Sequence, residues 1–246
     1  MENLLRGATD YLKGLKVIAQ HGLWVYFWIP VLLSLLLGGI VISGAWAASD
    51  NLGDWLISFY PFEWGRVAFE KMATLLSGLS IVVFTLLIFR YIIMAIAAPF
   101  MSLLSEKMEH KMYPGTPAVT FSFSKMASDL ARGIALALRN IVRELFLTIV
   151  LLLLTVILPI LSPVTPILIL LIQAYYAGFG NFDFTLERHA NMQQSVRFVR
   201  GNRMLAVGNG LVFVLLLMTV VGFLFALPLG TAAGTVSTLE RLDEAA

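Results

Sequence analysis

Long uncharged runs divide this chain, and the longest of them covers residues 145–182. A single α-helix of that length would measure about 57 Å, whereas a bilayer core needs only about 30 Å. Two complete membrane spans with a turn between them would need more residues than the run contains. Its middle holds Pro159, Pro163 and Pro166, and prolines this close together do not fit the interior of a regular helix. The pattern therefore predicts a re-entrant hairpin, in which two helices are joined by a proline turn inside the membrane.

A second uncharged run, residues 204–239, presents the same problem of length and contains Pro228. It is too long for one straight span and too short for two. We expect a second re-entrant hairpin that bends near Pro228. The alternative is one tilted span followed by a segment on the membrane surface.

Two further segments have the length of complete transmembrane helices. The first covers residues 22–49, has no charged side chain, and carries tryptophans near both ends, as interfacial aromatic belts do. The second covers residues 72–98, and its helical pattern continues to about residue 112. Arg90 interrupts it about 28 Å along the helix from Lys71, far enough to reach the opposite interface. A functional charge facing a cavity is the alternative for Arg90.

Amphipathic segments precede the first span and the first hairpin. Residues 1–21 place apolar side chains on one side of a helix and charged side chains on the other. Residues 121–144 gather charged side chains within about 80° of helical arc, opposite an apolar face. That charged face holds Lys125, Asp129, Arg132, Arg139 and Arg143. Both segments are predicted to lie in the membrane surface, and attraction of a substrate is the alternative role for the second.

Together these elements predict an all-α integral membrane protein with two long transmembrane helices, two re-entrant helical hairpins and amphipathic interfacial helices, in a single membrane domain over residues 1–246. The chain is 59% hydrophobic and 13% charged, with a mean hydropathy of +0.86, whereas soluble domains contain about 25% charged residues. In this layout fifteen of the seventeen Lys and Arg residues lie on one face of the membrane. The positive-inside rule then puts both termini in the cytoplasm.

The sequence offers little for catalysis or metal binding. It has no cysteine, and its three histidines lie far apart, so no metal-ligand spacing is present. Motifs typical of zinc proteases, serine hydrolases and phosphate-cradling loops are absent, and the carboxylates lie outside the predicted spans. We therefore expect a protein that is not an enzyme and has no cofactor.

The turn of the first hairpin is the strongest candidate for ligand binding. Thr165 suits a helix N-cap and Pro166 the first helical position. A helix N-terminus with free N–H groups would then lie deep in the membrane, where several transporters bind anions. The alternative is that the prolines only terminate helices. After the hairpin come four arginines that would either gather anions at an entrance or bind lipid phosphates: Arg188, Arg197, Arg200 and Arg203.

Several short stretches, taken in order, carry a resemblance to a known family. They are Tyr11-Leu12-Lys13-Gly14-Leu15, Gly22-Leu23, Ala98-Pro99-Phe100, Leu104-Ser105-Glu106-Lys107-Met108-Glu109, Asn181-Phe182-Asp183-Phe184 with His189, and Leu227-Pro228-Leu229. In this order the chain resembles the CysZ-type sulfate permeases and the related etoposide-induced membrane proteins. The resemblance covers nearly the whole chain.

This resemblance implies two groups of site residues. An anion site is expected at Gly22, Leu23 and Trp24, although Trp24 stands where the family typically carries an arginine, and tryptophan cannot make a charged bidentate contact. A central charged network is expected as well. Its candidate members are Arg90, Glu106, Lys107, Glu109, Asp183, Arg188 and His189.

The function implied is that of a permease or channel-like protein for a small oxyanion, with sulfate taken up for assimilation. The alternative is a non-transporting scaffold or membrane-shaping protein of the same family. The expected partners are sulfate or another small oxyanion, membrane lipids and further copies of the chain in a homo-oligomer, and not nucleic acid. The expected location is the bacterial inner membrane, which the chain would cross more than once.

Overall fold

The computed structural model describes residues 2–33, 35–37, 39–40, 43, 96–115 and 123–244. The chain forms two compact units, Met1–Val31 with Ala97–Ala246, and Leu32–Ile96. Nearly all of the described residues belong to the first unit. Arg90, most of the predicted span 72–98 and the end of the predicted span 22–49 lie outside the described residues.

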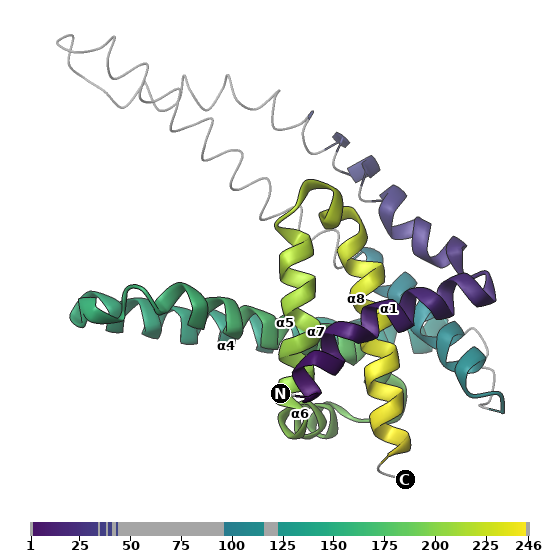
Figure 1. Cartoon of the computed structure of the whole chain (residues 1–246). Coiled ribbons are helices and arrows are strands. Elements are labelled where there is room, and N and C mark those ends of the chain that lie inside the picture. The colour runs from purple at the N-terminus through teal and green to yellow at the C-terminus, as the bar shows by residue number, and fades with distance from the viewer. Residues whose placement is uncertain are drawn as a thin grey trace. The chain divides into compact units, whose positions relative to one another are not determined.

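Every regular element in the described part of the chain is a helix (Figure 1). Two α-helices are not labelled in the figure, Trp24–Leu37 and one over residues 96–112. The remaining elements are α1 (Glu2–His21), α4 (Phe123–Ile157), the short 3₁₀ helix η1 (Pro159–Leu161), α5 (Thr165–His189), α6 (Met192–Gly201), α7 (Arg203–Leu217) and α8 (Val220–Asp243).

The first hairpin consists of α4 and α5, which pack against each other on either side of η1. The uncharged run is broken among its prolines, where the sequence predicts the turn. The position of the cap differs from the prediction by one residue. Val164 is the N-cap and forms no side-chain cap bond, while the Thr165 hydroxyl donates to the Leu161 carbonyl oxygen at 2.9 Å. Thr165 therefore ties the helix back to the turn and does not cap the free N–H groups.

The helix α4 also differs from the prediction, because it joins two segments that the sequence separates. The predicted surface helix, residues 121–144, and the first arm of the hairpin form one helix of 35 residues, about 52 Å long. There is no break at Leu145, since residues 134–157 hold neither proline nor glycine and their leucines are good helix formers.

The second hairpin consists of α7 and α8, and its bend lies about ten residues before the predicted one. Thr219 has an extended backbone, and its hydroxyl accepts a hydrogen bond from the Gly222 N–H at 3.0 Å, which caps α8. Pro228 lies inside α8. A helix tolerates such a proline where neighbouring helices enclose it, and Pro228 is buried. The expected bend at Pro228 is therefore wrong.

Small residues bring the helices of this unit into close contact. A side-chain carbon on Gly178 of α5 would overlap the carbonyl oxygen of Ala206, and one on Gly210 of α7 would overlap that of Ala174. Next to these contacts the Asn181 amide donates to the Asn209 side chain at 2.8 Å. Close backbone approach through glycine is typical of helices that pack within membranes.

The helix α1 packs on α7 and α8. Its Asp10 is fully buried and accepts a hydrogen bond from Ser237 of α8 at 2.6 Å. Lys13 forms ion pairs with both Asp10 and Glu240, each at 3.0 Å. One face of this amphipathic helix therefore faces protein.

Two described helices are long and apolar enough to cross a membrane, Ala131–Ile157 and Thr165–His189. A third candidate arises if α1 and the following helix, Trp24–Leu37, are one bent span. Only 6% of the most apolar window of α4 is buried. The apolar surface of α4 thus needs a cover of lipid or protein to stay out of water.

Candidate functional site

A network of charged side chains, centred on a buried glutamate, forms where three helices meet. The helix over residues 96–112 contributes Ser105 and Glu109, which are four positions apart and therefore share a face. The last turn of α5 contributes the adjacent residues Arg188 and His189. The geometry brings together side chains about 80 positions apart in the sequence.

Glu109 is the centre of this network and is only 7% exposed. Its Oε2 atom accepts hydrogen bonds from Arg188 Nε at 3.0 Å and Arg188 Nη2 at 2.9 Å. Its Oε1 atom lies 2.8 Å from His189 Nε2. Both carboxylate oxygens of Glu109 are therefore hydrogen-bonded to nitrogen atoms.

Arg188 donates hydrogen bonds through all three nitrogen atoms of its guanidinium group. Besides Glu109, it donates through Nη1 to the Phe184 carbonyl oxygen at 2.7 Å and through Nη2 to the Ser105 hydroxyl at 2.8 Å. A longer contact of 3.5 Å joins Nη1 to the Ser102 carbonyl oxygen. All the donors of the guanidinium group are thus engaged, as a buried charge requires.

A cluster of hydroxyl groups adjoins the arginine. Ser105 lies 2.8 Å from the Thr185 hydroxyl and accepts a hydrogen bond from Thr235 of α8 at 2.9 Å. All three side chains are fully buried. Hydroxyl groups donate and accept, so this cluster can bind an anion or bond to itself.

The environment favours the charged form of Glu109. Burial by itself favours the neutral acid, but the hydrogen bond with His189 and the charge and hydrogen bonds of Arg188 outweigh it. The pKa of Glu109 is therefore held below its usual value.

A second charged cluster joins α4, α5 and α6. Arg132 donates to both oxygens of Asp183, at 3.0 and 3.1 Å, and to the Ser195 hydroxyl at 2.8 Å. The sequence places Asp183 in the central network and Arg132 on a lipid-facing surface. In the structure the two residues pair with each other, because the predicted surface helix is part of α4 and packs on α5.

The other predicted members of the network lie elsewhere. Glu106 is half-buried and Lys107 is exposed. The exposed arginines after the first hairpin are Arg197, Arg200 and Arg203. Among the described residues none of these three forms a salt bridge, and Arg203 Nε donates to the Arg200 carbonyl oxygen at 3.1 Å.

The turn after α1 holds the second predicted anion site. Gly22 has a φ angle of +67°, in the left-handed region that glycine adopts most easily. Leu23 is buried, and its N–H donates to the Ile18 carbonyl oxygen at 3.0 Å. Trp24 is 39% exposed, and its ring packs edge-on against Phe27. This turn supplies one tryptophan N–H where the resemblance implies an arginine.

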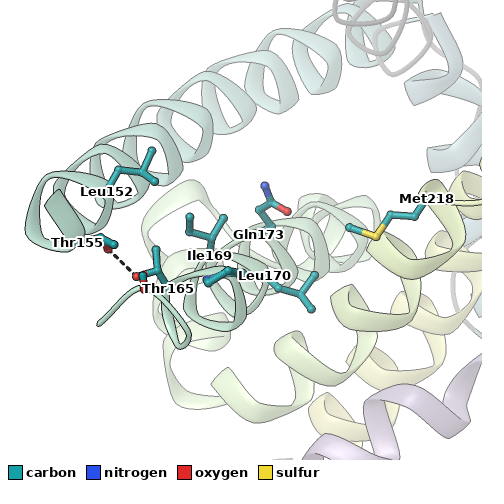
Figure 2. Close-up of a pocket in the computed structure, with 9 residues that line it drawn as sticks. Leu152, Thr155, Thr165, Ile169, Leu170, Gln173 and Met218 are labelled. Carbon is teal, nitrogen blue, oxygen red and sulfur yellow. Dashed lines mark hydrogen bonds between the residues drawn. The ribbon is translucent and has the colours of Figure 1, made fainter. Parts of the chain in front are cut away.

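The third predicted site lies at the tip of the first hairpin, in an open depression of about 520 Å³. Figure 2 shows the side chains that line it. The hydroxyls of Thr155 and Thr165 lie 2.5 Å apart across it. Pro166 belongs to the lining, together with leucine and isoleucine side chains and Met218. The lining contains no charged side chain, so an anion there would have only hydroxyl, amide and backbone N–H donors.

The sequence reasoning missed the hydroxyl cluster and the partner of Asp183. One signal was present for the cluster, because Thr231, Thr235 and Thr238 recur at helical spacing within an otherwise apolar run. Arg132 gave no comparable signal, since a basic residue on an amphipathic helix is typical of a lipid-facing surface.

The fold and the network define a helical membrane protein with a buried charged centre. The sequence matches the family of the sulfate transporter CysZ and etoposide-induced protein 2.4 over residues 10–228. The match covers most of the chain, and the protein therefore belongs to this family.

Proposed function

We propose that this protein is a permease or channel-like protein for a small oxyanion, with sulfate as the substrate. The observation that carries the proposal is the buried Glu109–Arg188 pair beside the hydroxyl cluster. Family membership supports sulfate in particular. A half-buried guanidinium group next to buried hydroxyl groups suits an oxyanion, because the hydroxyls replace the hydrogen bonds that the anion loses with its water.

In this proposal the Glu109 carboxylate occupies the place of the anion when the protein is closed. Sulfate oxygens accept the same kind of hydrogen bond from Arg188 as the carboxylate does. Entry of sulfate would displace Glu109 from Nη2, and Ser105 and Thr235 would turn their hydroxyl hydrogens to the anion. The exposed Arg197 and Arg203 would gather anions nearby.

The arrangement in the membrane follows from the charge distribution. Both hairpins would be re-entrant, and both termini would lie in the cytoplasm of a bacterium. Arg188 lies about 35 Å along α5 from the hairpin turn at Thr165, and this distance supports a position of the network at the cytoplasmic end of the proposed pathway. The helix α1 would lie in the interface, with its exposed Leu5 and Leu12 facing lipid. We further propose a homo-oligomer with no enzymatic activity.

The proposal is tested by radiolabelled sulfate uptake into proteoliposomes. Thr235→Val removes one hydroxyl from the cluster without changing its volume much and is expected to lower uptake about tenfold. Thr238→Val is the matched control, because Thr238 is equally buried in α8 and its hydroxyl has no hydrogen-bond partner in the described structure.

Two results would contradict the proposal. Uptake by the folded protein equal to that of empty vesicles would favour the alternative, a non-transporting scaffold. A loss in Thr238→Val as large as that in Thr235→Val would show that the cluster has no special role.

A further inference from the structure

Three arginines gather beside the base of the first hairpin. Arg139 and Arg143 lie four positions apart on α4 and therefore share a face, and Arg200 comes from α6. The positive charges of Arg143 and Arg200 both act on the Arg139 guanidinium group. Like charges repel, so an anion bound among the three arginines would reduce this repulsion.

Within the described part of the chain no salt bridge neutralises these arginines. Arg143 and Arg200 are exposed and Arg139 is half-buried. The half-buried Glu144 interacts electrostatically with Tyr176 at the edge of the cluster. One carboxylate against three guanidinium groups leaves the cluster with a net positive charge.

The floor of the cluster is aromatic. The Arg139 guanidinium lies 5.9 Å from the centre of the Phe179 ring, and its Nη1 donates to Asn140 at 2.9 Å. The rings of Tyr175 and Tyr176 are 5.1 Å apart and are half-buried. Arginine and tyrosine side chains together are typical of the level of lipid headgroups.

An exposed apolar surface accompanies the cluster on α4, where Leu138 and Val142 are 61% and 58% exposed, and it continues beyond the arginines. The continuation runs along α4 from Leu145 to Ile157, about 20 Å, which matches the depth of one lipid leaflet. Phe146, Leu153 and Ile157 of this surface are 64%, 57% and 70% exposed. Along α4, charged side chains are therefore followed by a long exposed apolar part. A phospholipid has the same order, with an ionic headgroup joined to apolar acyl chains.

We propose that Arg139, Arg143 and Arg200 bind the phosphate of an anionic phospholipid whose acyl chains lie along the exposed face of α4. The site takes lipid and not the free oxyanion, because the apolar surface adds contacts that a soluble anion lacks. It is separate from the Glu109–Arg188 network, and it does not depend on transport.

The test counts lipids bound to the full-length protein in detergent by native mass spectrometry. Phosphatidylglycerol is expected to bind at least tenfold more tightly than phosphatidylcholine with the same chains, because the phosphatidylcholine phosphate carries its own cation. Each arginine near a membrane surface contributes about a fivefold change in affinity. Arg200→Gln should therefore weaken phosphatidylglycerol binding about fivefold, and Arg139→Gln with Arg143→Gln about 25-fold.

The matched control is Arg197→Gln, which removes the same charge from an exposed position on α6. Arg197 is not among the charges that act on Arg139, so this variant should change binding by less than about twofold. A loss in Arg197→Gln equal to that in Arg200→Gln would overturn the proposal in favour of general surface charge. Equal affinity for the two lipids, or displacement of the lipid by inorganic phosphate at equal concentration, would overturn it as well. If the double glutamine variant does not fold, Arg139→Lys with Arg143→Lys keeps the charge, and its preference for phosphatidylglycerol must persist.

Discussion

Arg188 donates two hydrogen bonds to one oxygen of Glu109, through Nε at 3.0 Å and Nη2 at 2.9 Å. This pair fixes the helix over residues 96–112 to the end of α5. His189 bonds the other oxygen of the same carboxylate, so the contact allows little rotation of Glu109.

Glu109→Gln is expected to lower the stability of the protein strongly. Removing one member of a buried ion pair leaves the other charge uncompensated, which costs roughly 3–5 kcal/mol. Thermal unfolding in detergent, followed by circular dichroism, measures the loss. Glu106→Gln is the control, because Glu106 is half-buried on the same helix and belongs to no salt bridge in the described structure. An equal loss of stability in both variants would show that the Glu109–Arg188 pair stabilises the fold no more than Glu106 does.

Acid should destabilise the protein through Glu109. The pKa of Glu109 lies below its usual value of 4.5 in the folded protein, so its ionised form stabilises the fold at neutral pH. That contribution is complete above about pH 4.5 and is lost as the pH falls from there through the pKa of the folded protein. The midpoint of thermal unfolding, measured between pH 7 and pH 3, should fall less steeply in Glu109→Gln than in the wild type. Parallel curves for the two proteins would exclude this contribution.

Gly178→Ala and Gly180→Ala should have opposite effects. A methyl group on Gly178 would overlap the Ala206 carbonyl oxygen, whereas Gly180 has open space in the same helix. Gly178→Ala should cost more than about 2 kcal/mol through overpacking, and Gly180→Ala should gain about 0.5–1 kcal/mol through helix propensity. Thermal unfolding of the two variants makes the comparison, and equal midpoints would argue against the close contact of α5 with α7.

Arg132 and Asp183 should be strongly coupled. Arg132→Gln leaves the buried Asp183 without its partner, at a cost of roughly 3–5 kcal/mol. Asp183→Asn leaves the half-buried Arg132 without its partner and should cost less, because water reaches part of that side chain. The double variant should cost clearly less than the sum of the single variants, because neither charge remains unpaired. Unfolding of all four proteins completes the cycle. Strict additivity would mean that the bidentate contact does not stabilise the fold.

The hairpin tip can be located with a single cysteine, because the natural chain contains none. Ile160 is 85% exposed, and in a re-entrant hairpin Ile160→Cys should react slowly with membrane-impermeant maleimides added to either side. Gln194→Cys, at an exposed polar position of α6, should react from the cytoplasmic side only. Rapid labelling of Ile160→Cys from the periplasmic side would show instead that α4 crosses the membrane.

Much of the helical layout could be predicted from the sequence, because the length of an uncharged run and its prolines are local properties. The break between α4 and α5 is an example. Pro228 misled the prediction because the cost of a proline within a helix depends on what surrounds it, and the packing around α8 is not visible in the chain itself. The bend came instead from the capping hydroxyl of Thr219.

The candidate site shows a similar limit. Glu109, Arg188 and His189 could be named as candidates through the family resemblance, yet their contacts depend on how the helix over residues 96–112 meets α5. The pairing of Arg132 with Asp183 could not be predicted from the sequence, because an amphipathic pattern does not distinguish a face that contacts lipid from one that contacts a neighbouring helix.

The continuity of α4 makes this helix a lever. Arg132 anchors one end through Asp183, and Ile157 lies about 37 Å further along the same unbroken helix. A tilt of about 10° at the anchored end moves the far end by about 6 Å on this length. Changes in bilayer thickness, which helices accommodate by tilting, would thus act with a long moment arm on the Arg132–Asp183 contact. Bilayer thickness is therefore expected to affect the stability of the Arg132–Asp183 ion pair.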